Sequence, residues 1–418
     1  MYLFILGILL LLFAWISWRE PKQGLWLLAF ALPSYLLRFS ILEIPGTFLE
    51  SMILILAFVM LLKQPASFLL AWKTLPRVWK LIVVGTLAIA TLALLPSPDL
   101  LSALGAWKAY FIEPMLVFLL ARILFKNDQD ILHLLFAFGC SALAVSLFAI
   151  TQWVFEIGIP APWDIERRIT SFFPYPNAVG LFLGPICVAG IFAAKQAWAQ
   201  HKKPLLVFWI IVLFLSGAAI VLAQSEAAML AVLTTTFLLS LFSRFWRCIT
   251  VPLFAITILL IFLIPFARTM TWQKLTLQDY SGSVRLTQWE ETWNMLKDHP
   301  MMGAGLAGYP EALDPYHTHS YIEIFQYPHN LFLNAWTELG LLGLVLLVFF
   351  GILLFRSTPR VRTSWIKMMV LAVFAEMFIH GLVDVPYFKN DLSVLSWIFV
   401  ALLLYDTQSS PTKTSGHA

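Results

Sequence analysis

The sequence predicts an all-α membrane protein, a polytopic bundle of about 12 to 13 transmembrane helices with one large extracytoplasmic loop. Of its 418 residues, 60% are hydrophobic and only 12% are charged, whereas a soluble domain carries about 25% charged residues. One soluble core could not bury so much apolar surface, but a bilayer accepts it. The apolar residues also fall into segments long enough to cross a bilayer as helices.

Thirteen apolar segments are candidate spans, of which the first two or three are short. The first has no Lys or Arg before it and no small-residue cleavage site after it, so we expect a retained span rather than a signal peptide. The candidate spans are residues 1–18, 24–40, 47–62, 78–95, 105–125, 130–155, 176–194, 204–222, 226–243, 247–266, 329–355, 363–382 and 391–405.

The spans divide the chain into four parts: N-terminal helices (1–266), a large outer loop (267–328), C-terminal helices (329–405) and a disordered cytoplasmic tail (406–418). Lys and Arg gather in alternate connections, which the positive-inside rule places in the cytoplasm. The remaining connections are poor in Lys and Arg, rich in Pro and Gly, and predicted to face outward. They include 96–104, 156–175, 223–226, 383–390 and the large loop.

Composition also excludes some partners and cofactors. The net charge of +4 is spread along the chain, and no Lys/Arg run resembles a nucleic-acid-binding patch. Neither a P-loop nor a dinucleotide fingerprint is present. The three cysteines lie in or beside apolar segments without metal-ligand spacing. We therefore expect a membrane-lipid environment, no nucleic acid and no cofactor.

Two outer segments carry candidate anion-binding residues. Arg167 and Arg168 precede a Pro-rich turn; they suit a clamp on an anionic head group, or alternatively they snorkel to lipid phosphates or pair with nearby acids. In the large loop, Arg285 and Trp289 share one helical face with Gln288 and Thr292. That face suits a sugar-phosphate ligand, and the alternative is an interfacial amphipathic helix. The turn at 299–305 could bring bare backbone N–H groups close to an anion.

A second group of candidates begins where the large loop ends. His329 starts a spanning helix, whose positive end favours an uncharged ring that accepts a proton. Asn330, Asn334 and Glu338 then form a polar stripe that enters the membrane, where a carboxylate is expensive unless it faces protein or water. The alternative is a capping histidine followed by polar contacts between helices.

Intramembrane charges elsewhere have two interpretations each. Glu376, His380 and Asp384 recur every four residues, as in a proton relay of a transporter or in buried contacts that fix helix register. Lys108 lies near the outer end of its span, with an ionic partner or a lipid phosphate as its expected contact.

We expect no metal site. His317 and His319 have H-x-H spacing, but the chain offers no reliable third ligand beside them. Asp128-Gln129-Asp130 matches the D-x-D of many sugar transferases, but it lies on the predicted cytoplasmic side and is expected to be a solvated loop.

With these residues identified, the chain resembles the O-antigen ligase and O-antigen polymerase superfamily of bacterial envelope glycosyltransferases. The resemblance runs from about the third span to the last. Three stretches carry it: Arg168-x-Thr170-Ser171-x-Phe173-x-x-Pro176-Asn177; Arg285-x-x-x-Trp289 with Pro300-x-x-Gly303-x-Gly305; and His329-Asn330-x-x-Leu333-x-x-x-x-Glu338-x-Gly340-x-x-Gly343.

The first of these stretches looks like the family's R-x-T-G-x-F-x-N-P-N. One departure from the family pattern matters. The family often has S-R-G-A-x-L, with an arginine expected to hold a pyrophosphate. This chain has Ser225-Glu226-Ala227-Ala228-Met229-Leu230. Either Arg168, Arg285 or Lys108 covers the missing charge, or the donor differs.

The resemblance implies a GT-C-like, metal-independent enzyme of surface polysaccharide assembly, such as that of lipopolysaccharide, in the bacterial cytoplasmic membrane, with its active site facing outward. It implies transfer of a glycan from a polyprenyl (undecaprenyl) diphosphate donor to a hydroxyl of a glycan, lipid or protein acceptor. The implied catalytic residues are His329 and Arg285, and the implied substrate-binding residues are Arg168, Lys108, Asn330, Trp289 and Glu338.

Two alternatives to an O-antigen ligase-like transferase stay open. A polymerase of the same superfamily would differ only in its acceptor. A transporter or flippase of lipid-linked sugars would use Glu376, His380 and Asp384 as its coupling path.

Overall fold

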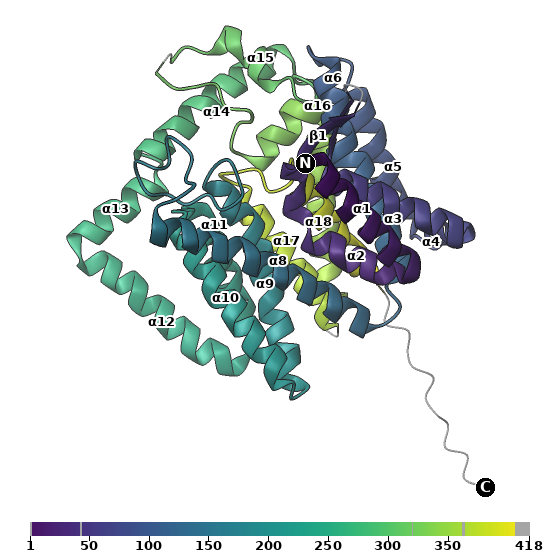
Figure 1. The fold of residues 1–418 in the computed structure, drawn as a ribbon. Helices are drawn as coiled ribbons and strands as arrows, with labels where there is room; N and C mark the ends of the chain where they lie inside the picture. Colours follow the sequence, from purple (N-terminus) through teal and green to yellow (C-terminus); the bar gives the residue numbers. More distant parts are fainter. Residues whose placement is uncertain (1, 42–43, 320, 362–363, 406–418) are drawn as a thin grey trace.

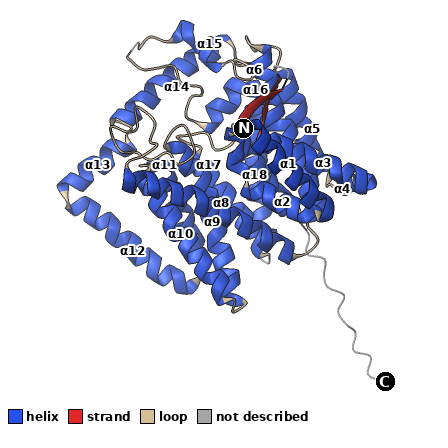
Figure 2. Ribbon diagram, viewed as in Figure 1, coloured by secondary structure: helices blue, strands red, loops and turns tan. Residues whose placement is uncertain are grey.

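The computed structural model describes residues 2–41, 44–319, 321–361 and 364–405. Helices make up nearly all of it, beside one two-stranded hairpin (Figure 2). The all-α membrane bundle that the sequence predicts is therefore confirmed. The tail expected to be disordered, residues 406–418, lies outside the described residues.

The chain from its N-terminus to the first long outer connection forms eight α-helices, one 3₁₀ turn, one π-helical turn and the hairpin. Their bounds are α1 (Tyr2–Arg19), α2 (Pro21–Phe30), η1 (Leu32–Leu36), β1 (Arg38–Ile41), β2 (Ile44–Thr47), α3 (Phe48–Lys63), α4 (Pro65–Lys73), α5 (Arg77–Leu92), α6 (Leu100–Trp107), η2 (Lys108–Ile112), α7 (Glu113–Leu124) and α8 (Asp128–Phe155).

The rest of the chain forms ten α-helices and a second 3₁₀ turn. The large outer loop is itself mostly helical, since α13 to α15 lie within or at the start of it. The bounds are α9 (Asn177–Ala199), α10 (Lys203–Leu222), α11 (Glu226–Ser240), α12 (Arg244–Leu263), α13 (Pro265–Leu275), α14 (Tyr280–Asp298), α15 (Tyr309–Leu313), η3 (Asp314–Tyr316), α16 (Leu331–Val361), α17 (Trp365–His380) and α18 (Asn390–Leu403).

Fewer helices than expected are long enough to cross a membrane alone. Among the described residues, seven are long and apolar enough, or up to eight if α3 and α4, which meet at a bend of 99°, count as one broken span. The sequence predicts 12 to 13. The difference arises because several expected spans form helices of only 14 to 16 residues, namely α3, α5, α11, α17 and α18.

The expected span at residues 24–40 is wrong as a single helix. α2 ends at Phe30, η1 follows with Pro33 near its start, and the chain then enters β1. Proline has no N–H to donate and its ring clashes with the carbonyl four residues earlier, so α2 cannot continue through Pro33. β1 pairs antiparallel with β2, and Thr47 then caps α3 by accepting a hydrogen bond from the Glu50 N–H.

The core of the bundle is built around α9, whose most apolar stretch is 83% buried. Glycines let neighbouring helices approach closely, as is common between membrane helices. A Cβ atom added to Gly190 would lie 3.0 Å from the ring of Trp209 on α10. α12, in contrast, has no buried residue and runs along one side of the bundle, connected to α13 (Figure 1).

The connections expected to face outward meet at one end of the bundle, at the top of Figure 1. Ser97 donates its hydroxyl to the Leu306 carbonyl at 2.9 Å, and Arg285 donates to the Val383 carbonyl at 3.1 Å. Three connections that lie far apart in the sequence are therefore hydrogen-bonded to one another. We call this end of the bundle the loop end.

A break in α16 fixes the large loop to the bundle. Gly340 has φ +71° and ψ −175°, outside the helical region. The Leu341 N–H bonds to the Met301 carbonyl instead of continuing the helix, and the Thr337 carbonyl accepts the N–H groups of Ala304 and Gly305 at 2.8 and 3.2 Å. Helix and loop thus exchange hydrogen-bond partners at this break.

The glycine turn is consequently not a cradle of bare N–H groups, and that expectation is wrong. The Gly303 N–H bonds to the His299 carbonyl, and the Leu306 N–H bonds to the Ala93 carbonyl. The Ala307 N–H donates to Glu338 Oε2 at 2.9 Å. The turn is glycine-rich because Gly303 and Gly305 have φ +64° and +79° and pack directly against backbone atoms.

We predict that Gly340→Ala destabilises the protein. Its backbone conformation is nearly restricted to glycine and costs another residue about 1–3 kcal/mol, and the added Cβ would also collide with the Met301 carbonyl. Thermal unfolding in detergent measures the loss. Gly217→Ala is the control, because a Cβ there meets open space. Equal melting temperatures for Gly340→Ala and wild type would contradict the exchange of hydrogen bonds between α16 and the loop at Gly340.

Candidate functional site

His329 lies in a turn that is held by hydrogen bonds on both sides of the residue. Its φ of +44° is left-handed, which is uncommon for a residue other than glycine. The indole of Trp289 donates to the Pro328 carbonyl at 2.8 Å, and the Leu331 N–H donates to the Gly381 carbonyl at 2.7 Å. These bonds fix the backbone on both sides of the histidine and compensate for its strained conformation.

Asn330 caps α16. Its side-chain oxygen accepts the N–H groups of Phe332 and Leu333, both at 3.0 Å, and its amide donates to the Leu382 carbonyl at 2.8 Å. Asparagine is among the preferred N-cap residues because it satisfies otherwise unpaired amides of the first helical turn. Its expected contact with substrate stays a prediction, and the capping contacts give it a structural role.

His329 is paired with Asp384. The His329 Nδ1 lies 3.5 Å from Asp384 Oδ1, and the aspartate is fully buried while the histidine side chain stays 17% exposed. Burial alone would raise the pKa of Asp384, but the contact with His329 and the charges of both His329 and His380 lower it to about 2. The carboxylate therefore stays charged near neutral pH beside Nδ1 of the imidazole, and a negative charge there favours the ring with its proton on Nδ1 and with Nε2 as the proton acceptor.

The expected helical row of Glu376, His380 and Asp384 is wrong in its last member. α17 ends at His380, and Asp384 lies in the following connection. Gly381 ends the helix, because its N–H still bonds to Met377 while its carbonyl bonds to Leu331 of α16. Glu376 and His380 remain four apart on α17 with 3.4 Å between Oε1 and Nδ1, and both are fully buried.

Arg285 lies beside this pair. Its Nε donates to the carbonyl of Val383, the neighbour of Asp384, at 3.1 Å. The same face of α14 holds the chain that leads to His329, because Gln288 Nε2 donates to the Tyr327 carbonyl at 2.9 Å. The face of α14 that the sequence predicts to carry Arg285, Gln288 and Trp289 therefore packs against the rest of the protein. Trp289 and Gln288 on it hold the turn that carries His329, and the expected contact of Trp289 with substrate stays a prediction.

Arg168 belongs to the same charged region. Its guanidinium donates to the carbonyl of Ala223 and to the side chain of Asn177, both at 3.3 Å, and lies over the ring of Trp163. Burial lowers the pKa of Arg168, Glu166 and Glu226 raise it, and Arg285 lowers it further. The positive charges of the two arginines thus act on each other, and an anion between them would relieve that repulsion.

The comparisons with known proteins agree with this arrangement. Residues 211–348, about a third of the chain, match the family model of O-antigen ligase. This stretch is similar to O-antigen ligases. The resemblance of the chain to the O-antigen ligase and polymerase superfamily is thereby confirmed. A comparison with curated proteins gave no match. Arg285 and His329 lie inside the matched O-antigen ligase domain, whereas Arg168 and Asp384 lie outside it.

Two other residues expected to bind substrate have protein partners. Lys108, on η2, forms an ion pair of 2.7 Å with Glu50 of α3. Glu338 accepts the Ala307 N–H and is 6% exposed, so its carboxylate holds the glycine turn. Their roles as substrate ligands stay predictions, but both side chains have a structural contact.

The glutamate that departs from the O-antigen ligase family pattern also has a partner. Both carboxylate oxygens of Glu226 accept from Lys274 Nζ of α13, at 2.5 and 2.6 Å. The expectation that Arg168, Arg285 or Lys108 covers the missing charge stays a prediction. Sequence reasoning missed Lys274, because 48 residues separate it from Glu226 and no local spacing connects them.

Lys389 is a second residue that the sequence did not single out. It is buried behind His329, with its ammonium 4.9 Å from the ring centroid of Tyr175 and 5.0 Å from that of Phe173. The Tyr175 hydroxyl bonds to that of Tyr327 at 2.7 Å, and the Tyr327 ring contacts His329. The Lys389 ammonium thus lies against the aromatic side chains that connect to His329.

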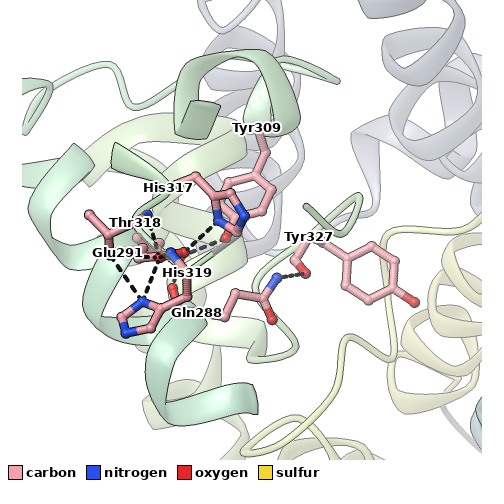
Figure 3. Close-up of polar contacts among 8 residues, drawn as sticks. Gln288, Glu291, Tyr309, His317, Thr318, His319 and Tyr327 are labelled. Atoms are coloured by element: carbon pink, nitrogen blue, oxygen red, sulfur yellow. Dashed lines mark hydrogen bonds and ion pairs between the residues drawn. The ribbon is translucent and has the colours of Figure 1, made fainter. Parts of the chain in front are cut away.

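The two histidines with H-x-H spacing contact a carboxylate in the outer loop (Figure 3). Glu291 faces His317 Nδ1 and His319 Nδ1, each at 3.1 Å, and accepts the Thr318 N–H at 2.9 Å. Burial opposes the charge, but these contacts together lower the pKa of Glu291 to about 2. Within the described ranges, no three His, Cys, Asp or Glu side chains are grouped so as to hold a metal.

We predict that Glu291 ties the 317–319 segment to α14 in a pH-dependent way. Because its pKa is depressed from about 4.3 in an unfolded chain, its stabilisation is present above that pH and is lost as the pH falls toward 2. Glu291→Gln should lower stability at pH 7 by about 2 kcal/mol, and the difference from wild type should shrink between pH 5 and pH 2.5.

Thermal unfolding across that pH range measures this difference. Glu290→Gln is the matched control, since Glu290 is the exposed neighbour on α14. A difference for Glu291→Gln that stays constant from pH 7 to pH 2.5 would show that its ionised carboxylate does not hold the segment.

Proposed function

We propose that the protein is a membrane glycosyltransferase that moves a glycan from a polyprenyl diphosphate donor to an acceptor hydroxyl, in the manner of an O-antigen ligase. The observation that carries this proposal is the histidine–aspartate pair with Arg285 hydrogen-bonded beside it. The pair supplies a base, and the arginine supplies a cation for a leaving group. The matched O-antigen ligase domain supports this reaction class.

The reaction needs one proton acceptor and one stabiliser of negative charge. His329 Nε2 takes the proton of the acceptor hydroxyl as its oxygen attacks the anomeric carbon, and Asp384 stabilises the imidazolium that forms. The bond from the anomeric carbon to the diphosphate oxygen breaks, and that oxygen carries the electron pair away. Arg285 and Arg168 neutralise the charge that develops on the diphosphate.

An apolar cavity next to the pair suits a lipid-linked donor. The cavity, of about 120 Å³, lies between α5, α16, α17 and α18. Leu331, two residues after His329, and Pro386, two residues after Asp384, both line it. A hydrocarbon chain bound there would gain about 25 cal/mol for each Å² that leaves water, with its diphosphate beside the arginines.

We place the site on the outer face of the bacterial cytoplasmic membrane. The connections between the helix ends away from the loop end carry most of the Lys and Arg residues, which favours this orientation. A polymerase of the same superfamily would use the same base and cations with a different acceptor. The glycans that accumulate without the enzyme separate the two, because long chains indicate a ligase and single repeat units a polymerase.

We predict that His329→Ala lowers kcat by at least about 100-fold, the usual contribution of a positioned base. Asp384→Asn should lower kcat by about tenfold or more, because it removes the charge that orients the imidazole and stabilises its protonated form. The measurement is mass spectrometry of polyprenyl-linked glycans in a host whose gene is deleted and then restored with each variant, supported by transfer rates of the purified protein.

His299→Ala is the matched control, because this exposed histidine lies in the same outer loop. It should restore transfer fully. Full transfer by a folded His329→Ala variant would overturn the catalytic assignment. Unchanged glycans in the deletion host would overturn the transferase itself and favour a transporter that uses Glu376 and His380.

A further inference from the structure

An exposed ion pair lies at the edge of the site, between helices that are far apart in the sequence. Lys274 of α13 contacts both carboxylate oxygens of Glu226, the first residue of α11. The side chains stay 46% and 55% exposed, and Asp279 approaches the lysine to 3.8 Å. Exposed ion pairs add little to the stability of a folded protein, so a contribution to stability does not explain this pair.

The pair continues the row of charges that leads to the catalytic histidine. Arg168 donates to the carbonyl of Ala223, three residues before Glu226, and the charges of Glu226 and Arg285 both act on Arg168. Arg285 in turn bonds next to Asp384. Lys274 contacts Glu226 and Asp279, and Arg168 lies close to the start of the helix that carries Glu226, with Glu166 3.9 Å from its guanidinium.

We propose that Lys274 binds a phosphate of the lipid diphosphate donor and that Glu226 occupies this phosphate position while the site is empty. This inference rests on the proposed function. An incoming diphosphate displaces the carboxylate from the ammonium and places its negative oxygens between Lys274 and Arg168. Lys274 thereby supplies the cation that the family pattern provides from residue 226 itself.

Geometry and exposure favour this role over a purely structural one. An ammonium group binds phosphate as a compact point charge, and the exposed fraction of Lys274 leaves it accessible to a ligand. α13, which carries Lys274, packs against α12, the helix without buried residues. A lipid-linked donor that arrives from the bilayer would reach it there.

The test measures binding of inorganic pyrophosphate to the purified full-length protein by calorimetry. Lys274→Gln should weaken binding by about tenfold, because it removes a charge-assisted contact. Glu226→Gln should strengthen binding by about threefold or more, because it removes a competing negative charge. Both variants break the same ion pair, so a structural role predicts changes in the same direction.

Arg268→Gln is the matched control, because this exposed cation lies on the same helix. It should leave the affinity for pyrophosphate unchanged, and Lys274→Arg should retain most of it. In the transfer assay, Lys274→Gln should raise the KM for the donor more than it lowers kcat.

The inference and the proposed function fail in different ways. If Lys274→Gln binds pyrophosphate as wild type does, or if Glu226→Gln weakens binding, Lys274 is not a phosphate ligand. The transferase reaction would still stand as long as His329→Ala blocks transfer. If Lys274→Gln does not fold, Glu226→Gln alone decides, since only tighter binding supports the proposal.

Discussion

The exchange of hydrogen bonds at Gly340 is the constraint on which the rest of the site depends. A helix inside a membrane normally keeps its own backbone bonds, because no water is present to replace them. Here Leu341 bonds to Met301 of the loop, and the freed Thr337 carbonyl accepts two loop N–H groups. These two released groups find partners in the loop, and so a long polar loop is attached to an apolar helix by backbone hydrogen bonds.

This attachment determines where α14 lies, and α14 determines the position of His329. The loop is fixed at residues 301–307, and α14 lies over two turns. The first turn connects the loop to α16, and the second connects α17 to α18. Trp289 then bonds to the first turn and Arg285 to the second. His329 and Asp384 come from different turns. Because α14 is hydrogen-bonded to both turns, it positions the two residues relative to each other.

Local patterns in the sequence predicted part of this arrangement. Apolar runs located the helices, and spacing placed Arg285, Gln288, Trp289 and Thr292 on one face. A spacing of four residues wrongly placed Asp384 on the same helix as Glu376 and His380. Spacing alone does not reveal that the helix has already ended at Gly381. Likewise the turn with glycines at 303 and 305 suggested an anion site, whereas the Gly305 N–H bonds to Thr337 at the break in α16 and the Gly303 N–H bonds to His299 within the loop. Contacts between distant segments, such as Lys274 with Glu226, leave no local pattern at all.

The outer connection that carries Arg168 shows how a family motif can tolerate a departure. The family has glycine where this chain has Ser171, and Ser171 indeed adopts a left-handed φ of +52°. Gln152 compensates for this strain, because its side-chain oxygen accepts the Ser171 N–H at 2.7 Å and the Thr170 N–H at 3.1 Å. The serine hydroxyl also bonds to the Val145 carbonyl at 2.7 Å. Contacts from α8 thus preserve the backbone conformation of the segment that carries Arg168. Serine in place of glycine at residue 171 therefore leaves the position of the Arg168 guanidinium unchanged.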